Sequence, residues 1–171
     1  MNTLYVDTKQ IMHKSLNALA TLLEKIQGQI GEDTEKEQAL INGRLAPDMF
    51  TFARQVQITT DNAKGAMSRL SGSENPVMED TEQTLAELIA RVKKTAEFVK
   101  NTSNEELQTA DERKMTLSYF PGKFQTAEDY TRDHAIPNFY FHFVAAYAII
   151  RMQGYEIGKA DFIGGLNLQD M

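Results

Sequence analysis

The fold of this chain is decided by the stretch His134-Ala-Ile-Pro-Asn-Phe-Tyr-Phe-His-Phe-Val-Ala-Ala-Tyr-Ala-Ile-Ile-Arg151. Most of its side chains are apolar, which predicts a helix that is central in the core or covered by a second subunit. Three polar exceptions, His134, Asn138 and His142, recur every four residues and therefore stack on one helical face. Pro137 beside them is expected to kink the helix. The pattern indicates a polar pocket inside a helical bundle.

Three further long helices are predicted upstream, because apolar residues recur there every three or four positions. The second is expected to open at Pro47 and Asp48, since proline is tolerated in a first turn and an acid is favourable there. Asp80 with Gln83 resembles a capping box for the third. The four predicted spans are Asp7 or Thr8 to Gly28, Leu45 to Leu70, Asp80 to Lys100, and Thr126 to Gly154.

Between the last two helices, residues 114–125 alternate apolar and polar side chains on both sides of Pro121-Gly122. This predicts a small β-hairpin that packs against the helices or a partner chain. Ser103 with Glu106 has capping spacing and predicts a short extra turn before it. The expected architecture is all-α: a four-helix bundle with a small β-hairpin before the last long helix, forming a single domain over residues 1–171.

Composition narrows the class of protein. The chain has 171 residues, 42% of them hydrophobic, and a net charge of −6, which argues against a nucleic-acid partner. Its densest basic group, Arg91, Lys93 and Lys94, is interpreted as a solvated helix face. It has no cysteine and its start lacks signal-peptide character, so we expect a cytoplasmic protein. The apolar stretch Phe139 to Ile150 is too short for a membrane span, because a span needs about 20 residues.

The pocket expected inside the bundle combines two helices. Gln57 and Asp61 are four residues apart beside the apolar stripe of the second long helix, and Gln55 lies near them. A buried glutamine needs partners, and Asn138 and His142 can supply them. Two interpretations stay open: a closed hydrogen-bond network that fixes helix packing, or a pocket that orients a small polar ligand. A carboxylate such as Asp61 near a histidine is also the pattern of an acid–base pair.

A metal at this pocket has only partial support from the residues. His142 is the chief candidate ligand, and Asn138 one turn away offers a neutral amide oxygen, a poor ligand for Zn²⁺. His134 lies eight residues from His142, about 12 Å along a helix, which is too far for both rings to share an ion unless Pro137 changes the geometry.

Five blocks of sequence stand out as a set: Asn42–Phe50, Ala53–Gln57, Pro137–His142, Ala146–Arg151 and Gly158–Gly164. Together they resemble a bacterial family catalogued as a domain of unknown function and grouped with the DinB/YfiT-like proteins. The resemblance extends from about Tyr5 to Gly164.

The resemblance implies a four-helix bundle of the DinB type, commonly a dimer. In the wider superfamily, three histidines hold a divalent metal, and some members use it to activate a low-molecular-weight thiol. By position, these ligands fall on Asn138 and His142 in the fourth helix and near Gln57 in the second. Only His142 is a histidine.

Two functional hypotheses follow. The first is a bundle without the metal triad, whose polar pocket of Gln57, Asp61, His134, Asn138 and His142 binds a small ligand in a homodimeric scaffold. The second is a metal-dependent hydrolase or thiol-dependent transferase that holds Zn²⁺ or Ni²⁺ through His142. The apolar fourth helix and the hairpin motivate the homodimer under both.

Overall fold

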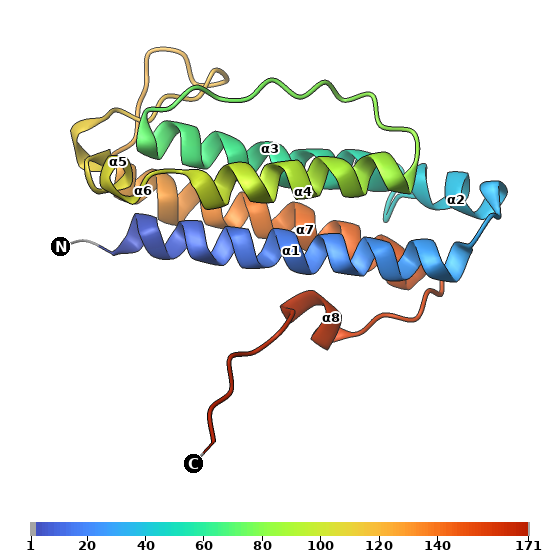
Figure 1. Ribbon diagram of the computed structural model, residues 1–171. Helices are drawn as coiled ribbons and strands as arrows, with labels where there is room; N and C mark the ends of the chain where they lie inside the picture. Colours follow the sequence, from blue (N-terminus) through green and yellow to red (C-terminus); the bar gives the residue numbers. More distant parts are fainter. Residues whose placement is uncertain (1–2, 171) are drawn as a thin grey trace.

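Four long helices lie side by side around one core in the computed structural model, which describes residues 3–170 (Figure 1). They are α1 (Leu4–Ile30), α3 (Phe52–Ser71), α4 (Leu85–Asn101) and α7 (Ile136–Met152). Figure 1 shows α1 and α7 running in one direction and α3 and α4 in the other. Residues 72–84, which connect α3 to α4, run back along the outside of the bundle. The all-α bundle predicted from the sequence is confirmed.

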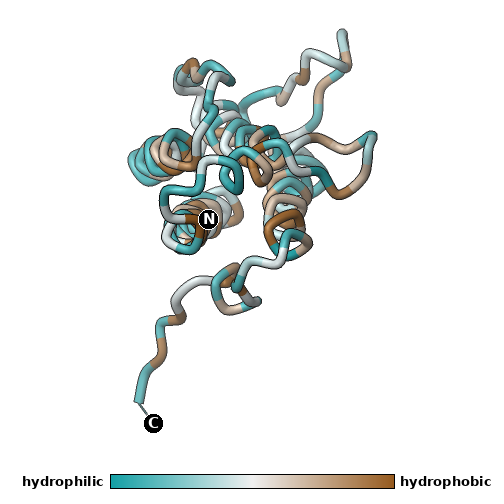
Figure 2. The backbone as a smooth tube through the Cα atoms, turned by 90° about the vertical axis from the view of Figure 1, so that its right-hand side faces the viewer, coloured by the Kyte–Doolittle hydropathy of each residue, from teal (hydrophilic) through white to brown (hydrophobic). Residues whose placement is uncertain are grey.

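Shorter elements close the ends. They are α2 (Thr34–Ile41), α5 (Asn104–Gln108), a 3₁₀ turn (Ala110–Glu112), α6 (Ala127–Asp129), a π-helical turn (Tyr130–Ala135) and α8 (Lys159–Ile163). α5 begins where the Ser103 side chain accepts from the Glu106 amide, as its sequence spacing predicts. Seen along the bundle, apolar residues line its interior and α8 lies below it (Figure 2). None of the described helices is long and apolar enough to cross a bilayer.

Two predicted helix starts are displaced toward the C-terminus. α3 begins at Phe52 because the Thr51 side chain accepts from the Arg54 amide, whereas Pro47 and Asp48 lie in the preceding turns. α4 begins at Leu85, where Thr84 and Glu87 form a reciprocal capping box. In both cases a threonine side chain accepts a hydrogen bond from a free N–H of the first turn, so the helix begins after that threonine and not at the predicted residue.

The predicted β-hairpin at residues 114–125 is wrong. Met115 and Gln125 form one isolated antiparallel bridge through two backbone hydrogen bonds of 3.0 and 2.9 Å, and the described residues contain no strand. Between them, the amide of Phe120 donates to Leu117 and that of Lys123 donates to Phe120. Turns thus take up the N–H groups that a ladder needs, and Pro121 has none to offer.

The C-terminal helix α8 closes the bundle from below. The Phe162 ring lies 4.3 Å from that of Phe143 on α7, and Lys25 on α1 forms a salt bridge of 2.9 Å with Asp161. The core of the bundle is continuous and includes Leu23, Phe52 and Phe139. α8 therefore joins the first and last long helices.

Pro137 does not break the last helix. It lies in the first turn of α7, directly after the π-helical turn. A π turn carries an extra residue, so it absorbs the backbone bond that proline cannot make and rotates the two helical parts against each other.

Candidate functional site

A seam of neutral polar side chains joins α3 to α7. At its buried end, Nδ1 of His142 lies 2.6 Å from Oε1 of Gln55. Because an amide oxygen only accepts, Nδ1 carries the proton and donates it. Burial, and secondarily the charge of Arg54, lower the pKa of His142, so the imidazole is neutral near pH 7.

The next contact along the seam joins two asparagines. Nδ2 of Asn138 donates to Oδ1 of Asn62 at 2.8 Å. Nδ2 of Asn62 is buried and has no hydrogen-bond partner among the described residues. Both asparagine side chains therefore hold α3 against α7, and one donor is left over.

His134 does not continue this stack, because it lies within the π-helical turn that precedes α7. Its Nε2 lies 2.9 Å from the hydroxyl of Tyr119, and its ring stacks on Tyr130. Burial and the nearby charge of Arg69 lower its pKa, in that order of size. His134 is thus a half-exposed, neutral imidazole at the open end of the seam.

Gln57 and Asp61 lie on another side of α3 and do not meet the histidines. Two residues advance a helix by roughly 200°, so Gln55 faces α7 while Gln57 faces residues 72–84. Nε2 of Gln57 donates to Glu82 at 2.9 Å, and Asp61 accepts from Arg91 at 2.8 Å. The predicted pocket residues are therefore divided between two networks.

Arg91 is the centre of the second network, so its interpretation as a solvated residue was wrong. Its side chain is 2% exposed and forms salt bridges to Asp61, Asp80 and Glu82 within 2.8–3.0 Å. It also donates to the backbone oxygen of Glu79 at 2.9 Å. Three of these partners belong to residues 72–84, so Arg91 fastens that segment to the bundle.

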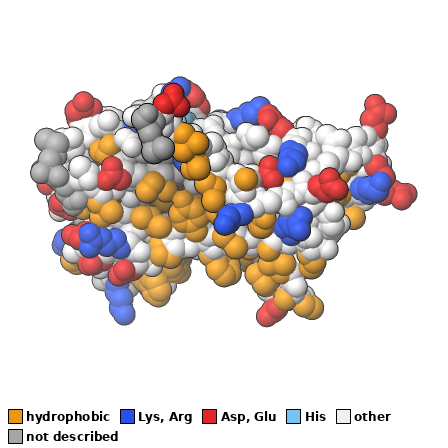
Figure 3. Space-filling model, turned by 90° about the horizontal axis from the view of Figure 1, so that it is seen from below, with side chains coloured by type: hydrophobic (Ala, Val, Ile, Leu, Met, Phe, Trp, Pro, Cys, Tyr) orange, Lys and Arg blue, Asp and Glu red, His pale blue; other side chains and the backbone are white. Residues whose placement is uncertain are grey.

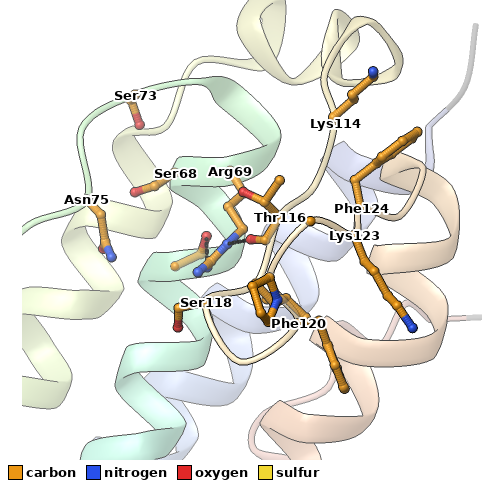
Figure 4. Close-up of a pocket in the computed structure, with 14 residues that line it drawn as sticks. Ser68, Arg69, Ser73, Asn75, Lys114, Thr116, Ser118, Phe120, Lys123 and Phe124 are labelled. Carbon is orange, nitrogen blue, oxygen red and sulfur yellow. Dashed lines mark hydrogen bonds between the residues drawn. The ribbon is translucent and has the colours of Figure 1, made fainter.

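A cleft of about 860 Å³ opens at the other end of α3, between that helix, the residues that follow it and residues 114–124 (Figure 4). Arg69 lies between the two walls, with Ser73 and Asn75 on one side and Ser118 and Phe120 toward the other. Arg69 connects this cleft to the seam, because its guanidinium lies 5.9 Å from the centre of the Tyr130 ring, on which His134 stacks. Tyr119, the partner of His134, belongs to residues 114–124 but does not line the cleft. The seam therefore runs from a closed buried end to an open cleft.

The residues at the expected metal position do not fit a tightly held Zn²⁺ or Ni²⁺. The His142 Nδ1 proton is directed at Gln55, and the neighbouring polar groups are neutral amides, whereas these ions prefer imidazole, thiolate or carboxylate. Within residues 3–170, no group of three or more His, Asp or Glu side chains is placed to hold a metal ion.

The sequence predicted the polar residues of α7 better than it predicted the residues that contact them. Gln55, Asn62 and Arg69 are seven residues apart and so share one face of α3, which is the signal that identifies the seam. Tyr119 had no such signal, since it reaches His134 from an irregular segment.

Fold and site together define a DinB-like helical bundle whose second and fourth long helices meet along a polar seam. The chain belongs to the family described as "Domain of unknown function (DUF1993)", whose model matches residues 4–163. A crystal structure of a DinB family member protein from Shewanella denitrificans is similar, at 33% identity over 99% of this chain and 96% of that chain, with a TM-score of 0.91. The comparison with curated proteins found no match.

Proposed function

We propose that this protein is a metal-independent binding module for a small molecule, built around the α3–α7 seam. One observation carries the proposal: at the position where metal-dependent relatives are expected to place ligands, His142 and Asn138 are each paired with a neutral amide. Each of these two side chains already has a hydrogen-bond partner on α3, which is typical of structural contacts and not of free ligands.

Within the proposed module, the five predicted pocket residues have different tasks. His142 and Asn138 join α7 to α3, and the neutral imidazole of His134 contacts Tyr119 in the segment that forms one cleft wall. Gln57 and Asp61 act through the Arg91 network. That network holds residues 72–84, which carry Ser73 and Asn75 into the cleft wall. The seam and the charged network thus position opposite walls of one binding site.

The proposal is tested by metal analysis of protein purified without a histidine tag, combined with a thermal-shift screen of small polar metabolites. We expect no stoichiometric ion in the wild type after exposure to Zn²⁺, Ni²⁺ or Mn²⁺, and the same result for His142→Ala. At least one compound class should raise the melting temperature. About one ion per chain, lost in His142→Ala, would instead support a metal-dependent hydrolase or thiol-dependent transferase with His142 as chief ligand.

We also propose that the module works as a homodimer through the outer face of α7. Phe141 is 57% exposed and Val144 is 49% exposed, and both line a groove of about 480 Å³ with Leu45 and Met49. Figure 3 shows hydrophobic side chains gathered on the face of the molecule below the bundle. Exposed apolar surface of this kind is typical of an interface, and a second copy of the chain offers a matching one.

Light scattering at micromolar concentration tests the dimer. We expect twice the chain mass for the wild type and the chain mass for Phe141→Glu. Ile11→Glu is the matched control, since Ile11 is also an exposed apolar residue but lies on α1. A monomeric wild type contradicts the proposal. The lack of cysteine makes a reducing cytoplasm the setting we propose for this dimer.

A further inference from the structure

We propose that the cleft beside α3 binds a small phosphate ester with an aromatic or apolar body, and that Arg69 is its main anion-binding residue. The inference rests on the proposed binding function and names its ligand class. It is carried by the charge, the hydrogen-bond polarity and the apolar wall of the cleft.

The cleft is basic in an acidic protein. Arg69, Lys114 and Lys123 line it, and none of its lining residues is Asp or Glu, although the chain has a net charge of −6. No described carboxylate lies within 4.0 Å of any of the three cations. A concave surface of one sign attracts ligands of the other sign.

Arg69 is fixed in place without being neutralised. Its Nε donates to the backbone oxygen of Thr116 at 3.3 Å, and its Nη1 donates to that of Gly65 at 3.0 Å. Its guanidinium also lies 5.9 Å from the centre of the Tyr130 ring. These partners are uncharged, so the positive charge remains available and is already oriented toward a ligand.

Two polar side chains of the cleft, Ser73 and Asn75, keep N–H or O–H donors available. Ser73 Oγ lies 2.8 Å from Ser71 Oγ and accepts its proton, which leaves the Ser73 hydroxyl proton free. The Asn75 carbonyl oxygen accepts from Lys64 at 3.4 Å, which directs the amide N–H groups elsewhere. A group with several acceptor oxygens and a double negative charge matches such a set better than a carboxylate does.

The opposite wall is apolar and suits the rest of a ligand. Phe120 and Phe124 line the cleft and are more than half exposed, and Lys114 lies 4.6 Å above the Phe124 ring. Exposed aromatic rings beside cations favour a ligand that carries a ring next to its charge. A cleft of about 860 Å³ is in the size range of small-molecule sites.

Calorimetric titration at low ionic strength with phenyl phosphate, inorganic phosphate and benzyl alcohol tests the inference. Phenyl phosphate should bind tightest, and benzyl alcohol should bind at least about tenfold more weakly, because it lacks the charge. Arg69→Met should weaken phenyl phosphate at least about tenfold, and Lys123→Glu about threefold or more. Lys159→Glu, the same charge change on α8, should alter the affinity less than about twofold.

Since Arg69→Met also removes contacts to the backbone of Thr116, Lys123→Glu keeps the test valid if that variant fails to fold. Equal binding of benzyl alcohol and phenyl phosphate overturns the inference, and so does equal weakening by Lys159→Glu. Tighter, steeply salt-dependent binding of single-stranded RNA would overturn it in favour of a nucleic-acid surface. If another compound class stabilises the protein while phosphate esters do not, only the ligand class fails. If nothing binds, the proposed function fails with it.

Discussion

The two polar faces of α3 hold their neighbours in different ways. Toward α7, uncharged groups meet one to one: Gln55 with His142 and Asn62 with Asn138. Toward α4 and residues 72–84, one buried guanidinium serves several carboxylates at once. The first face joins two regular helices, whereas the second fastens a segment that has no helix or strand of its own.

This difference follows from where backbone hydrogen bonds are made. α3 and α7 satisfy their own N–H and C=O groups, so a few neutral contacts are enough to fix their register. Residues 72–84 lack such a ladder, and Arg91 replaces it with side-chain bonds and one bond to the Glu79 oxygen. Loss of one neutral partner should therefore act locally, whereas loss of the cation leaves several negative charges together.

The largest effect is expected for Arg91→Met. Removing the cation leaves Asp61, Asp80 and Glu82 without their common partner, and we expect a loss of about 2–4 kcal/mol in the free energy of unfolding, measured in urea. The two aspartates are about one-third exposed, so water limits the loss. Limited proteolysis within residues 72–84 should also become faster.

Lys93→Met is the matched control for Arg91→Met. It lies on the same helix, but its salt bridge to Glu24 is exposed, so we expect less than about 1 kcal/mol. Similar losses in the two variants would show that the buried cation has no special role in fastening the segment.

A smaller effect is expected for His142→Ala. The variant leaves the Gln55 amide oxygen unpaired at a buried site, and we expect a loss of about 1–3 kcal/mol in urea unfolding. Proteolysis of residues 72–84 should not change. His13→Ala, on the outer part of α1, is the control, and an equal loss there would contradict the seam's contribution.

The burial of His142 beside Gln55 should also make the stability of the protein depend on pH. Since the folded-state pKa of His142 is lowered, the unfolded chain binds its proton first as the pH falls below about 6.5, and stability decreases through that window. His142→Gln should reduce the stability difference between about pH 7.5 and pH 5. His134→Gln should act in the same direction. Parallel pH curves for wild type and both variants would contradict this.

The smallest effect is expected for the double variant Asn62→Leu with Asn138→Leu. Replacing both partners of a neutral pair by apolar side chains of similar size removes the hydrogen bond and the unpaired Asn62 donor together. We expect a change within about 1 kcal/mol by thermal or urea unfolding. Each single variant should be less stable than the double variant, and additive losses would mean that the pair is not coupled.

Much of the fold follows from local sequence. The helical periods locate all four long helices, and Ser103 with Glu106 correctly marks a short one. Alternation at residues 114–125 misleads because strand pairing depends on which amides remain free after Pro121-Gly122 makes its turns. The starts of α3 and α4 depend on which of several polar residues caps the helix, a choice of a few tenths of a kcal/mol to about 1 kcal/mol.

The site is less predictable for geometric reasons. The four-residue spacing correctly predicts that Asn138 and His142 share a helix face. His134 is not on that face, because it lies in the π-helical turn. Gln57 was the expected partner of His142, whereas the structure pairs His142 with Gln55, two residues earlier in α3. The sequence indicates a surface residue at Arg91, beside Lys93 and Lys94, since its acidic partners lie outside its own helix, in residues 72–84 and on α3. Tertiary contacts of this kind leave no local pattern.

The position of α8 has a consequence for synthesis on the ribosome. Phe162 and Asp161 pack against α7 and α1, so the first helix to emerge finds one of its neighbours only after almost all the chain has been made. Its main neighbour, α4, is complete only when the chain has reached Asn101. The apolar side of α1 therefore stays uncovered until α4 has been made, and the part that α8 packs against stays uncovered until near the end of translation, so the nascent chain must keep α1 soluble during this time.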